Sequence, residues 1–248
     1  MYTLSLPEMK NFQVSMKSAN RQSGANNLFD ALSERECGRL LAGQSTIQVD
    51  VGEVLHKCGE VIRWVYFPCG CLVSLLAAVE KNMSLEVGLI GSEGMVGTAV
   101  ALGNGVSQLS AVVQNAGAAV RIESGHFREQ FKKIPSLQRE LDRYTHALML
   151  QSMQTAVCSH FHMLDARLAR SLLSTRDRLQ SDEFHLTHEF LAHKLGVRRV
   201  GVTKAACALQ QKNLISYSRG DIKILDGNGL EGCACLCYQI IKGLDRHP

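Results

Sequence analysis

The chain has 248 residues, of which 46% are hydrophobic and 20% charged, a composition that is ordinary for a globular protein. Its formal net charge of +4 allows a nucleic-acid partner without requiring one. The sequence has no run of about 18 apolar residues, so we expect no membrane partner. It also does not begin with a basic segment followed by an apolar stretch, as a secretory signal would, so we expect a cytoplasmic protein. The odd number of cysteines, nine, argues against a disulfide framework and favours reduced thiols.

The beginning of the chain is polar and lacks periodicity, which predicts a flexible arm over 1–27. A short helix is expected over 27–43. Ser33 is its predicted N-cap, and Glu34 and Glu36 lie in its first turn, where negative charge favours a helix.

Between Thr46 and Ile122, short runs rich in Val, Ile and Leu alternate with glycines. Many short strands joined by glycine turns are typical of an antiparallel barrel or roll. No long amphipathic helix interrupts them, as a βαβ sheet would require. The expected strands lie within 47–51, 61–67, 72–79, 85–90, 110–113 and 118–122.

The pattern becomes helical after Ser124, with a short helix over 125–133, a break at Pro135 and a long helix over 136–158. Apolar side chains recur along the long helix at spacings of three and four. Such a seam packs either on another helix or on the protein's own barrel. The seam residues are Leu137, Leu141, Tyr144, Leu148 and Thr155, with Gln151 between the last two.

The segment 186–215 predicts a helix-turn-helix after an amphipathic helix over 164–179. Thr187 is the predicted cap of the first helix, and Gly196 lies where that helix must end in a sharp turn. The second helix carries basic residues and no acidic one between positions 197 and 212, and a basic second helix favours entry into the major groove of DNA.

Two arginines, Arg198 and Arg199, occupy the first turn of the second helix, where cations oppose the helix dipole. This placement suggests an anionic partner, since arginine binds guanine edges and phosphates. The strand–turn–strand pattern over 213–224 predicts a wing from which Arg219 and Lys223 reach phosphates. The alternative is a small helical domain with a solvated basic face.

From Leu28 onward the chain resembles the Crp/Fnr family of bacterial transcription regulators. The resemblance is strongest in LTHEFLAHKLGVRRVGVTKAACALQQKNLI and GEVLHKCGEVIRWVYFPCGCLVSLL, and it includes the ending GLEGCACLCY. It implies an α+β fold: an N-terminal antiparallel, jelly-roll-like β-roll similar to a cyclic-nucleotide-binding domain, a long dimerisation helix and a C-terminal winged helix-turn-helix. The implied domains are a sensor roll over 28–135, the dimerisation helix over 136–163 and a DNA-binding domain over 164–248. The seam of the long helix then becomes the expected homodimer interface.

The resemblance also assigns the DNA contacts. Arg199 matches a base-reading arginine and Lys204 a base- or backbone-contacting position. Val200 stands where many members have glutamate, and valine cannot accept a hydrogen bond from cytosine, so we expect a changed half-site. The full predicted DNA-binding set is Arg198, Arg199, Val200, Thr203, Lys204, Thr187, His188 and Arg219. Double-stranded DNA is the expected partner, with RNA polymerase as a further possible one.

The sensor end departs from the members that bind cyclic AMP, which carry a Gly-Glu-Leu segment and an arginine for the phosphate. The matching stretches place an effector pocket at Gly97, Thr98, Gln108 and Leu109. No Arg or Lys occurs from position 84 to 120, and a cyclic phosphate needs a cation or a well-formed nest of N–H groups. We therefore expect cyclic AMP to bind weakly or not at all, and we predict no cofactor.

The cysteines and histidines are interpreted mainly as structural residues. No cysteine precedes Cys37, unlike in the iron–sulfur members of the family. If the cysteines fill space in the core and the histidines are solvated, the protein binds no metal at these residues. The alternative is that zinc or haem binds near Cys158 and His162. This interpretation covers Cys58, Cys69, Cys71, Cys158, Cys233, Cys235 and Cys237, with His160, His162, His185, His188 and His193.

No phosphate loop, nucleophile elbow or paired metal-ligand helix occurs, so the chain is not expected to be an enzyme. The sequence predicts a DNA-binding transcription regulator that acts as a homodimer on a near-palindromic site. The alternative function is a redox or small-molecule sensor whose output is mainly protein–protein contact.

Overall fold

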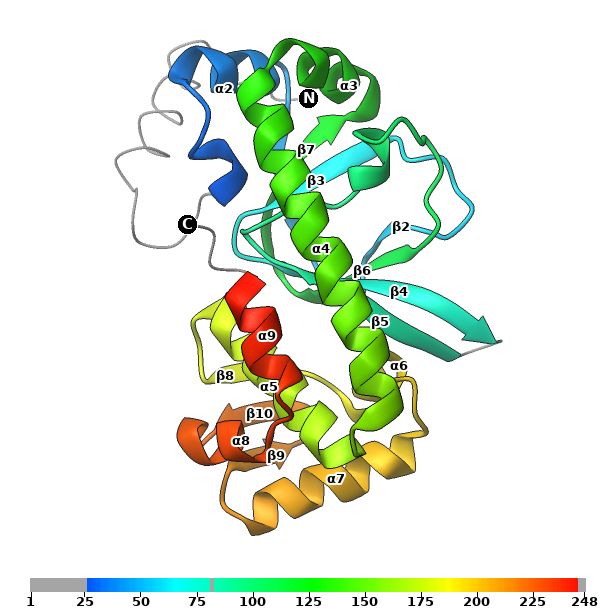
Figure 1. Cartoon of the computed structure of the whole chain (residues 1–248), viewed down its shortest axis with the longest axis vertical. Helices are drawn as coiled ribbons and strands as arrows, with labels where there is room; N and C mark the ends of the chain where they lie inside the picture. The colour runs from blue at the N-terminus through cyan, green and yellow to red at the C-terminus, as the bar shows by residue number, and fades with distance from the viewer. Residues whose placement is uncertain (1–25, 81–82, 245–248) are drawn as a thin grey trace.

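The computed structural model describes residues 26–80 and 83–244. The predicted flexible arm, apart from its last two residues, lies outside them. A β-roll and a smaller C-terminal unit lie one above the other, and the long helix α4 (Pro135–Phe161) runs beside both of them (Figure 1). None of the helices in the described residues combines the length and apolarity that crossing a membrane requires.

The roll consists of two antiparallel sheets, in the strand orders β1-β7-β3 and β2-β6-β4-β5. Glycine turns let short apolar strands fold back on one another, as the sequence predicted. The elements are η1 (Asn27–Phe29), α2 (Glu34–Leu40), β1 (Ser45–Val49), β2 (Val54–His56), β3 (Trp64–Pro68), β4 (Leu72–Glu80), β5 (Met83–Ile90), η2 (Thr98–Val100), β6 (Ser110–Asn115) and β7 (Gly117–Glu123).

The first α-helix is shorter than the predicted span of 27–43, because a turn separates η1 from α2. Ser33 caps α2 as predicted. Its hydroxyl accepts the N–H of Glu36, whose carboxylate accepts the N–H of Ser33 in return, which completes a capping box.

The seam of α4 packs on the roll of its own chain, so its assignment to a dimer interface is wrong. Helix α3 (Ser124–Lys133) precedes α4, as predicted. Leu137, Leu141 and Tyr144 are buried in the core of the roll, and Leu148 packs against that core. Thr155 is buried too. Gln151, the polar residue in this apolar seam, has a structural role: its side chain accepts the N–H of Leu89 at 2.7 Å.

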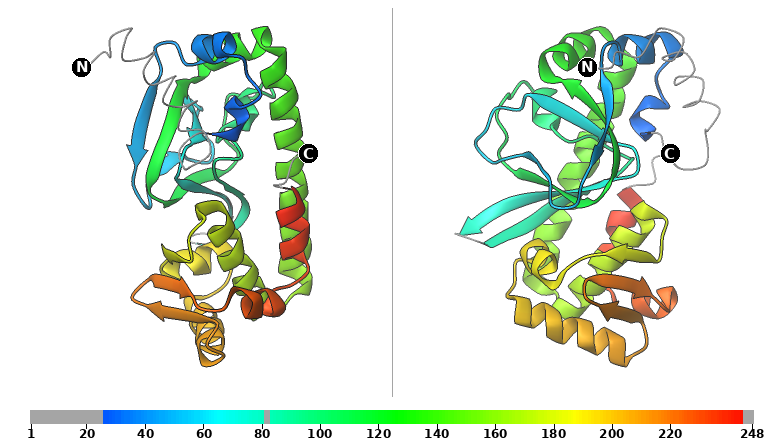
Figure 2. Two further views of the ribbon diagram at one scale, coloured as in Figure 1. Left: turned by 90° about the vertical axis from the view of Figure 1, so that its left-hand side faces the viewer. Right: turned by 180° about the vertical axis from the view of Figure 1, so that it is seen from behind.

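The C-terminal unit has its own hydrophobic core around α5 (Leu164–Leu179). A small sheet in the order β8-β10-β9 covers one side of it. The other elements are β8 (Glu183–His185), α6 (His188–Leu195), α7 (Arg199–Gln211), β9 (Ile215–Ser218), β10 (Asp221–Ile224), α8 (Gly227–Cys233) and α9 (Cys237–Leu244). Helix α9 runs back alongside α4 (Figure 2).

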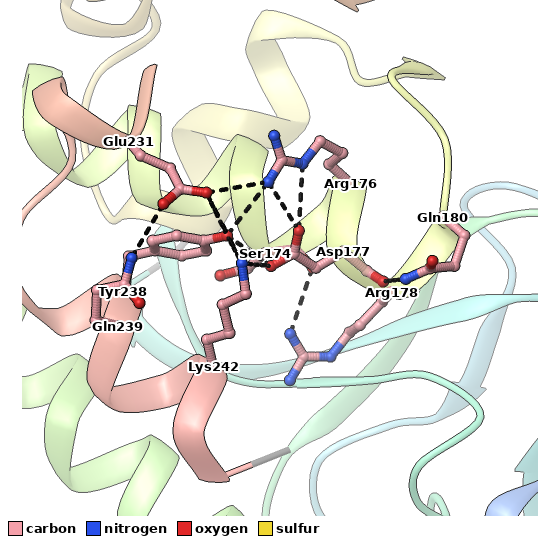
Figure 3. Close-up of polar contacts among 9 residues, drawn as sticks. All are labelled: Ser174, Arg176, Asp177, Arg178, Gln180, Glu231, Tyr238, Gln239 and Lys242. Carbon is pink, nitrogen blue, oxygen red and sulfur yellow. Dashed lines mark hydrogen bonds and ion pairs between the residues drawn. The ribbon is translucent and has the colours of Figure 1, made fainter. Parts of the chain in front are cut away.

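A polar cluster fastens the last two helices to α5 (Figure 3). The hydroxyl of Tyr238 donates to Asp177 at 2.7 Å, and Lys242 lies 3.4 Å from the same carboxylate. Arg176 bonds to Asp177 and reaches Glu231 of α8. The hydrogen bonds from Tyr238 and Arg176, with the charge of Lys242, outweigh burial and lower the pKa of Asp177.

We expect Gly94→Ala to destabilise the protein by about 1–3 kcal/mol, because overpacking of a filled core costs this much. A Cβ on Gly94 would overlap the ring of Tyr144, through which α4 packs on the roll. Denaturant unfolding measures the change. Gly105→Ala is the control, since a Cβ there meets no atom within 4 Å. Equal unfolding midpoints for both variants would contradict this packing.

Candidate nucleic-acid interface

Helices α6 and α7 form the predicted helix-turn-helix. The hydroxyl of Thr187 accepts the N–H of Phe190 and caps α6. Gly196 ends α6 in the left-handed region with φ +62°, which glycine adopts at the lowest cost. The chain then extends through Arg198, the N-cap residue of α7, so Arg198 precedes the helix instead of lying within it.

Helix α7 buries one face and presents the other to solvent. Val202, Ala205, Ala206 and Leu209 are buried in the C-terminal core, and the alanines allow α7 to lie close to α5. The opposite face carries the exposed predicted contacts Arg198, Arg199, Val200, Thr203 and Lys204. The helix lies at the end of the molecule farthest from α2 and α3 (Figure 1).

The start of α7 is electrostatically positive. Its first turn holds no acidic residue, and no side chain caps it. The unsatisfied N–H groups of a helix start carry partial positive charge, and Arg198 and Arg199 add two full charges there. An anion is the favoured neighbour for this arrangement.

Besides Thr187, which caps α6, two more of the predicted contacts are used inside the protein. His188 stacks on Tyr217 with ring centroids 4.2 Å apart, and its Nδ1 lies 3.1 Å from the hydroxyl of Thr203. Burial, followed by the charge of Arg199, lowers the pKa of His188. His188 therefore orients Thr203 and the wing in the structure.

The wing is the hairpin of β9 and β10. Its turn places Arg219 at φ +51° and Gly220 at φ +99°, and a Cβ on Gly220 would lie 2.5 Å from the ring of His185. Arg219 is exposed at the turn. Lys223 lies 2.6 Å from Glu183 across the sheet, but its side chain is 57% exposed, so its contact with phosphates stays a prediction.

A buried lysine that the sequence interpretation missed joins this domain to the roll. The ammonium of Lys194 lies 3.2 Å from Glu86 of β5 and donates to Gln114 of β6 at 2.6 Å. Burial lowers the pKa of Lys194 despite the opposing effect of Glu86. The signal was present: Lys194 follows Leu191 by three residues and precedes Leu195, so it falls on the apolar face of α6.

Further contacts extend this junction. Glu86 accepts from Ser74 at 2.6 Å, and Gln114 donates to Thr175 of α5 at 3.0 Å. Arg178 of α5 lies 2.9 Å from Glu93 in the loop after β5. Three polar bridges therefore connect the helix-turn-helix domain with the strands of the roll.

The predicted effector-pocket residues lie in the roll around the segment 56–62. A Cβ on Gly97 would lie 3.1 Å from His56, and the carbonyl of Gln108 accepts from the thiol of Cys58. A cavity of about 510 Å³ opens on the same segment, but its lining includes none of the four predicted residues. The cavity is lined by Leu55, His56, Lys57, Glu60, Val61, Arg63 and Trp64. The pocket assignment stays a prediction.

Residues 166–233 match the family model of the Crp-like helix-turn-helix domain. Solved regulators have a similar fold. FixK2 from Bradyrhizobium japonicum superimposes with a TM-score of 0.66 at 13% identity, over 77% of this chain and 98% of that one. The c-di-GMP-responsive global regulator CLP of Xanthomonas campestris gives 0.65 at 15% identity, over 77% and 99%.

A Crp/Fnr family transcriptional regulator from Thermus thermophilus gives a TM-score of 0.61 at 23% identity, over 77% of this chain and 98% of that one. No curated protein sequence matches the chain significantly. Residues 166–233 are therefore a Crp-like helix-turn-helix domain, and the chain shares the overall fold of these solved regulators.

We expect Lys194→Met to lower the free energy of unfolding by about 3–5 kcal/mol, because it leaves the buried carboxylate of Glu86 without its cation. Adding Glu86→Gln should restore part of this loss. Denaturant unfolding measures both effects. Lys223→Met removes an exposed ion pair and is the control, for which we expect little or no change in the free energy of unfolding. Equal small losses at both lysines would refute the role assigned to the buried pair.

Proposed function

We propose that this protein is a sequence-specific, DNA-binding transcription regulator that acts as a homodimer on a near-palindromic site. The observation that carries the proposal is the start of α7, which is exposed and whose charged residues are all basic. The opposite face of α7, which contains alanines, is buried in a Crp-like helix-turn-helix domain. Arginine at such a helix start pairs with guanine edges and phosphates. A transcription regulator of this kind acts on the chromosome, so the proposed location is the cytoplasm. The proposal includes no catalytic role.

The homodimer is proposed through the exposed face of α4, opposite the seam that packs on the roll. Met149, Met153 and Val157 are 47%, 55% and 46% exposed and recur at a spacing of four. Residues four apart lie on one face of a helix, so these side chains form an apolar stripe. Two such helices packed together would cover both stripes and place two recognition helices about 34 Å apart, one turn of DNA.

We expect Met153→Glu to shift the protein from dimer to monomer, because two carboxylates would face each other across the paired helices. Sedimentation equilibrium measures the shift. Leu102→Glu is the matched control, since Leu102 is 67% exposed and lies in the roll between η2 and β6, outside the proposed stripe. A dimer that tolerates Met153→Glu as well as Leu102→Glu would require another interface.

The roll is proposed to sense an effector and to change the orientation of the DNA-binding domain. Two routes connect them: α4, and the buried bridge from Lys194 to Glu86 and Gln114. An effector that moves β5 or β6 would disturb this bridge directly. We propose that cyclic AMP is not this effector, because the segment from 84 to 120 supplies no Arg or Lys for its phosphate.

Selection of bound sequences from random duplexes tests DNA binding, symmetry and spacing together. We expect two inverted half-sites one helical turn apart, and an affinity for random DNA that falls steeply with salt. Arg199→Ala should weaken the free energy of binding to the selected site by about 1–3 kcal/mol. The same substitution should change binding to random DNA little. Val200→Glu should alter the preferred half-site, because glutamate accepts from cytosine and valine does not.

Arg35→Ala, which removes an exposed arginine from α2 in the roll, is the control for lost charge. Cyclic AMP added to each binding reaction should leave the affinity unchanged. Equal losses for Arg199→Ala on specific and random duplexes would contradict base reading, and selection without enrichment would contradict sequence-specific binding.

A further inference from the structure

Four metal-ligating side chains converge where α4 ends. Cys158 and His162 come from the end of α4, and Cys235 and Cys237 come from the segment that begins α9. Their ligand atoms all lie within 4.8 Å of one another. The two pairs are about 75 residues apart in the chain, so no local spacing predicts that they meet.

Local geometry explains why both pairs aim at one point. Cys158 and His162 are four residues apart, which places them on one face of the helix end. The backbone at His162 is already extended, with φ −109° and ψ 142°, and this terminates the helix at the site. Cys235 and Cys237 flank one residue in the connection between α8 and α9, so the exposed Leu236 points away while both cysteines are buried.

The spacing of the ligand atoms suits a single tetrahedral ion. The sulfurs of Cys158 and Cys235 are 3.4 Å apart, and the sulfur of Cys237 lies 3.6 Å from Nδ1 of His162. Zinc–sulfur bonds of about 2.3 Å at tetrahedral angles put neighbouring sulfurs about 3.8 Å apart. Only shifts of a few tenths of an ångström separate these two pairs from that arrangement.

We propose that Cys158, His162, Cys235 and Cys237 bind one Zn²⁺ ion as a closed Cys₃His site that holds the C-terminal helix on the end of α4. All four positions would be occupied by protein ligands, which is the pattern of structural zinc sites. This proposal replaces the earlier interpretation of these residues as fillers and does not depend on DNA binding.

The surroundings complement the charge of such a site. Three thiolates and one Zn²⁺ ion carry a net charge of −1, and the positive charges of Arg167 and Arg170 act on this cluster. The Nε atoms of both arginines are buried without a hydrogen-bond partner among the described residues. The amide of Gln154 donates to the sulfur of Cys237 at 3.0 Å, a contact that orients a ligand from outside the metal's own shell.

The thiol groups of Cys158 and Cys235 share a hydrogen bond, with their sulfurs 3.4 Å apart. A thiolate is the form that binds metal. A disulfide between Cys158 and Cys235 is the competing use of the same atoms, and it would leave Cys237 and His162 without a shared role. The convergence of all four groups favours the ion.

Zinc at this point would act on the junction between α4 and α5. His162 lies two residues before the start of α5, which leads into the DNA-binding domain, and Val157 of the proposed dimer stripe lies one residue before Cys158. Binding to the folded state alone stabilises it. The ion would therefore fix the C-terminal helix and stiffen the connection between the dimer helix and the DNA-binding domain.

The test uses the full chain, purified under reducing conditions, stripped with a chelator and titrated with Zn²⁺. We expect one Zn²⁺ per chain and a higher melting temperature with the ion. Substitution by Co²⁺ should give thiolate-to-cobalt charge-transfer bands and the intense visible absorption of tetrahedral cobalt. X-ray absorption at the zinc edge should show three sulfurs and one nitrogen, at about 2.3 Å and about 2.0–2.1 Å.

Neighbouring residues supply matched controls. Cys235→Ser and His162→Ala should lose stoichiometric zinc and the zinc-dependent rise in melting temperature. Cys233→Ser and His160→Ala should keep both, since Cys233 and His160 lie two residues away from these ligands and outside the group of four. If a ligand variant does not fold, the absorption spectra of the unmodified chain still decide the coordination.

Failure of the reduced chain to bind zinc would overturn the proposal, as would a spectrum of oxygen and nitrogen ligands alone. Peptide mapping under non-reducing conditions tests for the competing disulfide between Cys158 and Cys235. A Cys158–Cys235 disulfide that persists in the presence of reductant and zinc would assign these cysteines to a covalent link instead.

Discussion

Burial of one face of α4 on the roll is the constraint on which the rest of the structure depends. A helix of 27 residues crosses from the roll to the C-terminal unit, and its seam is filled by its own chain. The ring of Tyr144 closes on Gly94 so tightly that a methyl group would collide with it. Because that face is occupied, the homodimer proposed above uses the opposite face of α4, around Met153.

The DNA-binding domain is also held by its own chain. Lys194, Arg178 and Thr175 reach polar partners on the roll or its loops, and the backbone carbonyl of Leu195 accepts from Arg167. A buried charge pair needs well-placed partners to offset its desolvation, so it is sensitive to small displacements. This sensitivity makes the junction a suitable place to convert a movement of the roll into a change at α7.

Sequence periodicity predicted the roll, the two long helices and the helix-turn-helix because each follows from local spacing. The helix-turn-helix follows the preferences of its residue types: Thr187 caps α6, Gly196 ends it, and the alanines of α7 are buried. The use of the α4 seam was misjudged for a physical reason. An apolar stripe records that a face is buried, but it carries no information about which surface buries it.

The sequence by itself determined the order of the elements, the positive charge at the start of the second helix of the helix-turn-helix, and the absence of Arg and Lys from positions 84–120. Only the tertiary structure decided which residues far apart in the chain meet. Lys194 finds Glu86 across the junction, and Cys158 and His162 find Cys235 and Cys237 at the end of α4. Such groupings depend on how whole elements pack, and no local spacing encodes the distance between two side chains on different elements.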